Sequence, residues 1–178
     1  MISVRDSTPD DAGPVDEVVA SAIAMLRQTY RPSEKARSHK RAIAGRLHRL
    51  VAESDGAVVG TTQYVIDGSV IRIIGLGVHR DSRREGVARA LVAEVADRAR
   101  NRGLSAVVAH TVEETGNVRV FKALGFEVQS RCPDAYSESV KGGRLTDVRL
   151  TMQLEENSTA DDSGRRRPPP GSTSSNQR

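Results

Sequence analysis

The chain has 178 residues, a net charge of +4 and one cysteine, which suggests one domain with at most an appendage. Aromatic residues make up 3% of it, too few for the stacking surfaces of single-stranded nucleic-acid binders. One cysteine excludes an intrachain disulfide and argues against a cysteine-based zinc site, so we expect no metal. We find no apolar run near 18 residues and no signal-peptide pattern, so we expect a cytoplasmic protein.

Residues 157–178 differ in composition from the rest of the chain. Ala160 is the only apolar residue there, so the segment cannot bury enough surface to offset the entropy of ordering it. We therefore predict a folded domain over 1–156 and a disordered tail rich in Ser, Pro and Arg over 157–178. The tail carries +2 of the net charge, from four arginines and two aspartates. Its run 165–167 could touch nucleic acid or an acidic lipid surface, but a solvated tail is the simpler interpretation.

The first half of the domain begins with a short strand over 2–5 and two helices. Thr8 and the following Pro-Asp-Asp begin a helix whose apolar residues recur every three or four positions up to Leu26. Arg31-Pro32 ends that helix region, because a residue before proline disfavours helical backbone. Ser33 can then cap a second helix.

Three strands and a long helix follow. Asp-Gly turns join the strands, which predicts an antiparallel meander. The strands are expected at 50–53, 58–66 and 70–78. After a helix over 83–102 we expect a buried strand over 105–112, a short helix over 117–124, and strands over 126–131 and 145–154. The total is about seven strands and four helices.

A basic segment joins the third strand of the meander to the long helix. Its arginines are Arg80, Arg83, Arg84 and Arg89. The first amides of a helix lack internal acceptors and lie at the positive end of its dipole. Gly86 and Ala88 are small enough for a phosphate to approach the backbone. The segment is neither a Walker loop nor a dinucleotide fingerprint. It predicts a site for a phosphorylated ligand, with a solvated basic turn as the alternative.

Arg83-x-x-Gly86-x-Ala88 resembles the Gln/Arg-x-x-Gly-x-Gly/Ala motif of the GNAT superfamily of acetyl-CoA-dependent N-acyltransferases. The strand residues 76–78 and the later Phe-Lys-Ala-Leu-Gly-Phe at 121–126 are similar to that family too. The resemblance covers about 1–155. It implies an α/β (α+β) fold with a mixed, mainly antiparallel sheet, splayed open between the strands ending at Val78 and Val112 to admit acyl-CoA.

The resemblance implies an N-acyltransferase that moves an acetyl group from acetyl-CoA to an amine of a small molecule or protein. The amides of 84–89 would hold the CoA pyrophosphate, and the backbone of 76–78 would pair with the pantetheine arm. A backbone N–H near Val78 would polarise the thioester carbonyl. The implied cofactor-binding residues are Leu76, Gly77, Val78, Arg83, Arg84, Glu85, Gly86, Val87, Ala88, Arg89, Asn117 and Phe121.

The chain departs from the family pattern at three places. Phe121 stands where many members have a tyrosine that protonates the leaving thiolate; Tyr30 or Tyr136 could substitute for it. Glu114 stands where an asparagine often binds the CoA arm; Asn117 could do so, or could cap a helix. No acidic base lies near 72–73, where some members have one.

His110 and Glu114 are the candidate catalytic residues. His110 lies near the end of a buried strand beside the implied cleft, and a histidine's ordinary pKa near 6.5 suits a base. It could equally be a hydrogen-bonded structural residue. Glu114, in the next loop, could orient an amine. His39 and His48 are expected to be exposed helix residues.

Tyr30 and Arg31 are the candidate substrate-binding residues, because side chains at a forced helix break can project into a cleft. Arg31 could pair with a carboxylate or phosphate of the acceptor; alternatively Tyr30 packs under the break and Arg31 is solvated. A non-catalytic acyl-CoA-binding or sensor module is the alternative function. We expect no membrane partner and no nucleic acid, and the sequence leaves open whether the chain forms a homodimer.

Overall fold

A seven-stranded sheet runs through the structure, a computed structural model that describes residues 1–155. The strand order is β1-β3-β4-β5-β6-β9-β7. The strands are β1 (Ile2–Asp6), β3 (His48–Ser54), β4 (Ala57–Asp67), β5 (Val70–Val78), β6 (Ala106–Val112), β7 (Glu127–Pro133) and β9 (Thr146–Gln153). The predicted tail over 157–178 lies outside the described residues. Within 1–155, no helix is long and apolar enough to cross a membrane.

The sheet is mixed, because β5 and β6 run parallel while every other neighbouring pair is antiparallel. The helices are α1 (Ala12–Leu26), α2 (Glu34–Ile43), α3 (Val87–Arg100) and α4 (Val118–Ala123). The predicted fold class, a mainly antiparallel sheet of seven strands with four helices, is therefore confirmed. The predicted meander is also confirmed, as β3, β4 and β5.

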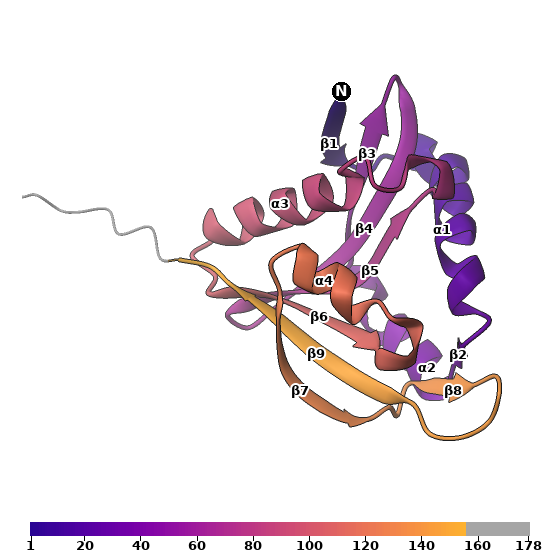
Figure 1. Cartoon of the computed structure of the whole chain (residues 1–178). Helices are drawn as coiled ribbons and strands as arrows, with labels where there is room; N and C mark the ends of the chain where they lie inside the picture. Colours follow the sequence, from indigo (N-terminus) through magenta and orange to yellow (C-terminus); the bar gives the residue numbers. More distant parts are fainter. Residues whose placement is uncertain (156–178) are drawn as a thin grey trace, which may run out of the picture.

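Two glycines show which helix covers which face of the sheet. A Cβ on Gly60 of β4 would lie 2.5 Å from Val87 of α3, and one on Gly77 of β5 would lie 3.1 Å from Ala22 of α1. Val78 is the partner of Gly60 in the β4–β5 ladder, so Gly77, its neighbour on β5, points to the other face. α1 and α3 therefore pack on opposite faces of the central strands, as Figure 1 shows.

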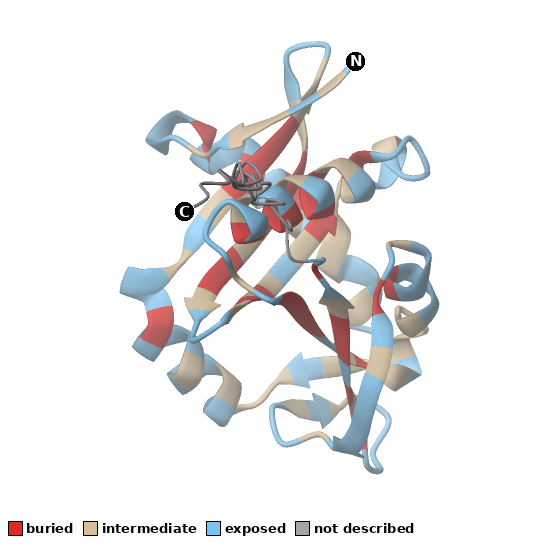
Figure 2. Ribbon diagram, turned by 90° about the vertical axis from the view of Figure 1, so that its left-hand side faces the viewer, coloured by how far each residue is buried: buried red, intermediate tan, exposed pale blue. Residues whose placement is uncertain are grey.

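The main hydrophobic core lies between α3, α4 and the sheet. It is almost entirely aliphatic, apart from Tyr64, Phe121 and Phe126. In Figure 2 the buried residues follow the strands and the inward sides of the helices, while the outer helix faces are exposed. A sequence with few aromatics thus fills its core with valine, leucine, isoleucine and alanine.

An ion network fixes the N-terminal strand to the first helical turn. Both Asp11 carboxylate oxygens accept hydrogen bonds from Arg5, at 2.7 and 2.8 Å, and Arg5 also donates to Glu53 of β3. The Asp11 carboxylate additionally accepts from the backbone N–H of Thr8. The hydrogen bonds from Arg5 and Thr8 stabilise the ionised form and hold the pKa of Asp11 well below its ordinary value.

Several local predictions are wrong. The long helix begins at Val87 rather than Arg83, because Arg84 (φ +67°) and Gly86 (φ +91°) adopt left-handed backbone conformations that helix cannot continue through. His48 begins β3, where it stacks on Tyr64 with ring centroids 5.1 Å apart, instead of lying on a helix. Asn117 makes no side-chain capping bond to α4.

The segment around the predicted helix break is a strand. β2 (Tyr30–Pro32) pairs antiparallel with β8 (Ser137–Ser139), forming a two-stranded ribbon outside the main sheet. Ser33 then caps α2, as predicted, by accepting a hydrogen bond from the Ala36 N–H at 3.3 Å. The ribbon lies beside α2 and the end of β6 (Figure 1) and borders the site described next.

Candidate functional site

The two parallel strands at the centre of the sheet separate halfway along their length. β5 pairs with β6 only through Val70–Arg72, against Ala106–Val108. From residue 73 onward β5 has no ladder partner on this side among the described residues, while its other edge stays paired with β4 up to Val78. Figure 1 shows β5 and β6 diverging from this point. The separation leaves a row of backbone donors and acceptors along 73–78 open to a ligand.

A bulge in β5 marks the place where the strands part. Gln63 of β4 pairs with Gly75 and Tyr64 pairs with Ile73, so Ile74 is left without a partner on β4. Such bulges bend a strand and increase its twist, and they are common beside active sites. This bulge therefore helps to turn the second half of β5 away from β6.

The N-terminus of α3 lies at the far end of β5 and offers unpaired amides. Gly86 occupies the N-cap position and no side chain caps the helix. The first backbone hydrogen bond of α3 runs from the Ala90 N–H to the Gly86 carbonyl, at 2.9 Å, so the N–H groups of Val87, Ala88 and Arg89 have no acceptor inside the helix. Together with the helix dipole they form a site suited to phosphate groups. The predicted loop residues Arg84, Glu85, Gly86, Val87, Ala88 and Arg89 are brought together here.

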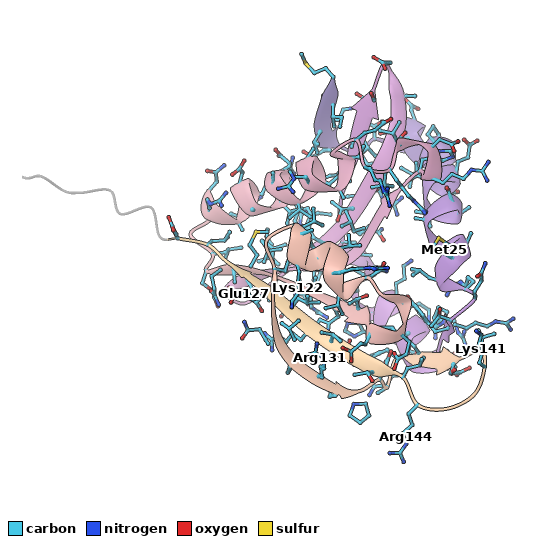
Figure 3. The ribbon with its side chains drawn as sticks, viewed as in Figure 1. Met25, Lys122, Glu127, Arg131, Lys141 and Arg144 are labelled. Atoms are coloured by element: carbon cyan, nitrogen blue, oxygen red, sulfur yellow. The ribbon has the colours of Figure 1, made fainter. Side chains whose placement is uncertain are left out.

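Arg83 of this loop and Arg89 in the first turn of α3 reach across to neighbouring helices. Arg83 donates to the Ser21 carbonyl at 3.3 Å and lies 3.6 Å from the Met25 sulfur, both on α1. Arg89 donates to the Ala123 carbonyl of α4 at 3.2 Å. Figure 3 labels Met25 and Lys122, which mark these two helices. The loop is thus fastened on both sides, with its amides left open between them.

A histidine–aspartate pair lies at the other end of the opening. His110 of β6 and Asp147 of β9 are joined by a hydrogen bond of 2.8 Å between Nδ1 and Oδ2. When Nδ1 carries the proton, it donates to the carboxylate, and Nε2 is left with a free lone pair. The His110 side chain is 43% exposed, so that lone pair can reach a ligand. The pair has the composition of a base with an orienting carboxylate.

The His110 side chain contributes to a cavity of about 350 Å³ between the separated strands, α2 and the β2–β8 ribbon. The cavity is lined by Tyr30, His39, Arg72, Ile73, Ile74, His110, Thr111, Val112, Asp134, Tyr136, Ser137 and Asp147. It contains two of the four candidate catalytic and substrate-binding residues, Tyr30 and His110, and also Tyr136, which was named as a possible acid. Burial raises the pKa of Tyr30 above its ordinary value, which keeps its hydroxyl protonated at neutral pH.

Arg31 and Glu114, the other two predicted residues, do not line this cavity. Arg31 is exposed on β2. The Glu114 carboxylate accepts a hydrogen bond from the Thr146 N–H, at 3.1 Å to each oxygen, and so holds the start of β9. Its placement favours a structural role for this carboxylate.

Phe121 is buried, with 9% of the residue exposed, and its ring packs edge-to-face on Phe126, with ring centroids 5.4 Å apart. It belongs to the core beneath α4 and carries no group that could donate a proton. Asn117 donates its backbone N–H to the Thr115 hydroxyl at 3.3 Å. The structure gives neither residue a contact that distinguishes a cofactor-binding role from a packing role.

Sequence reasoning missed Asp147, Arg72 and His39. Asp147 reaches His110 only because β9 lies beside β6, a pairing between segments 37 residues apart. His39 contacts Arg72 across α2 and β5, with 3.4 Å between Nε2 and Nη1. No local sequence pattern predicts such contacts. The alternation of β9 predicts only that Asp147 lies on the same face as Arg149.

Comparisons with known proteins agree with this geometry. The acetyltransferase (GNAT) family profile matches residues 16–126. The ribosomal-protein-S18-alanine N-acetyltransferase of Escherichia coli has a similar fold, with a TM-score of 0.67, 17% identity, and coverage of 88% of this chain and 98% of that one. An acetyl-CoA-bound GNAT acetyltransferase from Elizabethkingia anophelis has a TM-score of 0.63 at 15% identity, with coverage of 86% of this chain and 98% of that one. An IAA acetyltransferase from Bacillus cereus has a TM-score of 0.64 at 18% identity, with coverage of 86% of this chain and 100% of that one. The family match spans well over half of the chain, including the loop before α3 and both separated strands, and the chain therefore belongs to the GNAT family of acetyltransferases.

Proposed function

We propose that this protein is an N-acetyltransferase that moves the acetyl group of acetyl-CoA directly to an amine. One observation carries the proposal: pairing between β5 and β6 stops at Arg72, while the uncapped start of α3 lies at the far end of the opened strand. A linear ligand with phosphates at one end and a reactive acyl group at the other fits such a site. Acetyl-CoA has that form.

The cofactor would lie along the open edge of β5. Its pyrophosphate accepts hydrogen bonds from the amides of 84–89, and its pantetheine arm pairs with the backbone of Leu76, Gly77 and Val78 as an added strand would. The small residues of the loop, Gly86 and Ala88, let the phosphates approach the main chain. The oxyanion that forms when the thioester is attacked would be stabilised by a backbone N–H of the open edge at its His110 end, rather than near Val78 as the resemblance implies.

His110 would accept the proton that the amine loses. The amine nitrogen forms a bond to the acetyl carbon, the carbon–sulfur bond breaks, and the products are an acetamide and CoA thiolate. Nε2 of His110 takes one proton from nitrogen, and Asp147 holds the ring in the required tautomer through Nδ1. The proposal thus assigns the base to His110, whereas the Glu114 carboxylate accepts a hydrogen bond from the Thr146 N–H at the start of β9.

The leaving thiolate needs little help. Phe121 cannot protonate it, but a CoA thiol resembles cysteine, whose pKa is roughly 8.5, so its thiolate is a tolerable leaving group. Tyr30 and Tyr136 line the cavity and carry the hydroxyls that could return a proton to sulfur.

The phosphate site is tested by thermal unfolding with and without acetyl-CoA. Acetyl-CoA at 100 times its Kd adds about 2.7 kcal/mol of stability, which raises the midpoint of a domain this size by roughly 5–10 °C. Ala88→Glu puts a carboxylate in the first turn of α3 and is expected to abolish the shift. Ala93→Glu, on the exposed side of the same helix, is the matched control and keeps it. An equal shift in all three proteins, or none in the wild type, contradicts the assignment.

A further inference from the structure

The cavity beside His110 holds one permanently charged cation. Its lining contains two carboxylates, Asp134 and Asp147, but only one arginine, Arg72, and no lysine. Arg72 is the residue at which β5 leaves β6, so its side chain lies at the base of the opening. An arginine at the closed end of a substrate cavity needs an explanation, because it brings charge into a partly buried place.

The guanidinium of Arg72 is only partly satisfied by the protein. Nη2 lies 3.2 Å from the Asp67 carboxylate and Nη1 lies 3.4 Å from His39 Nε2. Nε is buried and has no hydrogen-bond partner, the one side-chain nitrogen or oxygen of this kind among residues 1–155. Leaving a buried donor of a charged group unmatched is costly. A ligand acceptor, reached after a change of the Arg72 side-chain rotamer, would remove that cost.

We propose that Arg72 binds a carboxylate of the acceptor, so that the substrate is a small amino-acid-like amine. This inference rests on the proposed acetyl transfer and names the class of its acceptor. Arginine pairs with carboxylates through charge-assisted, often bidentate hydrogen bonds. A modest change of side-chain rotamer, as is common on ligand binding, brings its donors to the ligand.

The positions of Arg72 and His110 on neighbouring strands suit such a molecule. Arg72 is paired with Val108, and His110 is two residues further along β6 on the same face. Two residues of a strand span roughly 6.6 Å. Arg72 and His110 can therefore hold the carboxylate and the amine of one small compound, with the amine directed at the thioester.

The β2–β8 ribbon limits the size of the acceptor. Tyr30 of the ribbon and Tyr136, the residue before β8, line the cavity. Backbone hydrogen bonds at both ends of the ribbon hold its two strands together: the Ser33 N–H donates to the Tyr136 carbonyl at 2.9 Å, and the Val140 N–H donates to the Thr29 carbonyl at 3.0 Å. A cavity of about 350 Å³ is near the lower end of the range for small-molecule sites. A folded protein surface does not enter it.

Matched pairs of amines test the inference through release of CoA thiol. Each L-amino acid is compared with its α-carboxamide, β-alanine and γ-aminobutyrate are compared with their amides, and spermidine and a lysine peptide are added. We expect at least one acid to exceed its amide by tenfold or more in kcat/KM. Equal rates for every acid and its amide, or a preference for the peptide or spermidine, overturn the inference while acetyl transfer stands. No thiol with any amine overturns the proposed function and the inference with it.

Substitutions locate the preference at Arg72. Arg72→Gln is expected to reduce the ratio of kcat/KM for the acid to kcat/KM for its amide to about threefold or less. The change should appear as a higher KM for the acid, with little change for the amide. Asp67→Asn removes the same ion pair but keeps the guanidinium, and it should retain the preference. A preserved ratio in Arg72→Gln overturns the assignment. If that variant does not fold, the wild-type acid and amide rates decide, together with Arg72→Lys, which keeps the charge without the bidentate geometry.

Discussion

Arg72 and Val108 are the last residues that join β5 to β6. Beyond this pair β5 turns away at the Ile74 bulge, while β6 stays paired with β9 as far as Val112. The proposed cofactor edge and the proposed acceptor cavity therefore begin at the same point of the sheet. A single change in strand pairing creates both parts of the site.

Removing the imidazole at position 110 tests the base. His110→Ala is expected to lower kcat by roughly 100-fold or more, the usual contribution of a general base, while KM for acetyl-CoA stays close to the wild-type value. Steady-state thiol release measures both. His48→Ala, a histidine outside the cavity, is the matched control and should keep wild-type kcat. A fall in KM or kcat of the same size in both variants argues against a catalytic role for His110.

The Asp147 carboxylate is expected to act through His110. Asp147→Asn removes the negative charge that holds the ring tautomer, so kcat should fall by about tenfold or more with little change in acetyl-CoA binding. Asp147→Glu should recover part of the rate. In a His110→Ala background the Asp147→Asn change should have almost no further effect. Additive losses would show that the two residues act independently.

The contact between Gly60 and α3 is expected to set how the helix lies on the sheet. Gly60→Ala would place a Cβ 2.5 Å from Val87 and 3.1 Å from Leu91, both fully buried. Overpacking of this kind costs about 1–3 kcal/mol, which lowers the unfolding midpoint by several degrees. Gly13→Ala, where a Cβ meets nothing within 4 Å, is the control and should not destabilise. An unchanged midpoint in Gly60→Ala would contradict the observed packing.

The bond between Arg5 and Asp11 predicts a pH-dependent stability. Because the folded pKa of Asp11 lies below the unfolded value near 3.9, its contribution is complete above that value and is lost as the pH falls through the folded pKa. Asp11→Asn should therefore unfold at a lower temperature at pH 7, and the difference from wild type should shrink below about pH 4. Thermal melts from pH 7 to pH 2 measure this. Asp10→Asn, at the exposed neighbouring position, is the matched control variant.

Local chemistry predicted much of the fold. Ser33 caps α2, and Asp55 and Gly56 form the β3–β4 turn with positive φ at both residues. These outcomes depend on a few neighbouring residues, which is why the sequence suffices. The β2–β8 ribbon could not be foreseen, because residues 30–32 and 137–139 form strands only by meeting each other across the fold.

The candidate site likewise has one part that the local sequence predicts and another that depends on the fold. The proposed phosphate site at the start of α3 could be predicted from a sequence motif, because Gly86 and Ala88 lie in one short segment and leave its backbone accessible. The proposed acceptor cavity depends on residues from α2, β2, β5, β6, β8 and β9, which come together only in the folded chain. His110 could be proposed from its position on a predicted strand. Its contact with Asp147 and the position of Arg72 in the same cavity could be found only from the structure.

Amine-dependent release of CoA thiol from acetyl-CoA is the most direct measurement of the central claim. The wild-type protein is expected to release thiol only when an acceptor amine is present, with an acetamide formed in equal amount, and His110→Ala should abolish most of this release. A wild-type protein that is stabilised by acetyl-CoA but releases no thiol with any amine would contradict acetyl transfer. That result would identify the chain as a binding module that kept the fold.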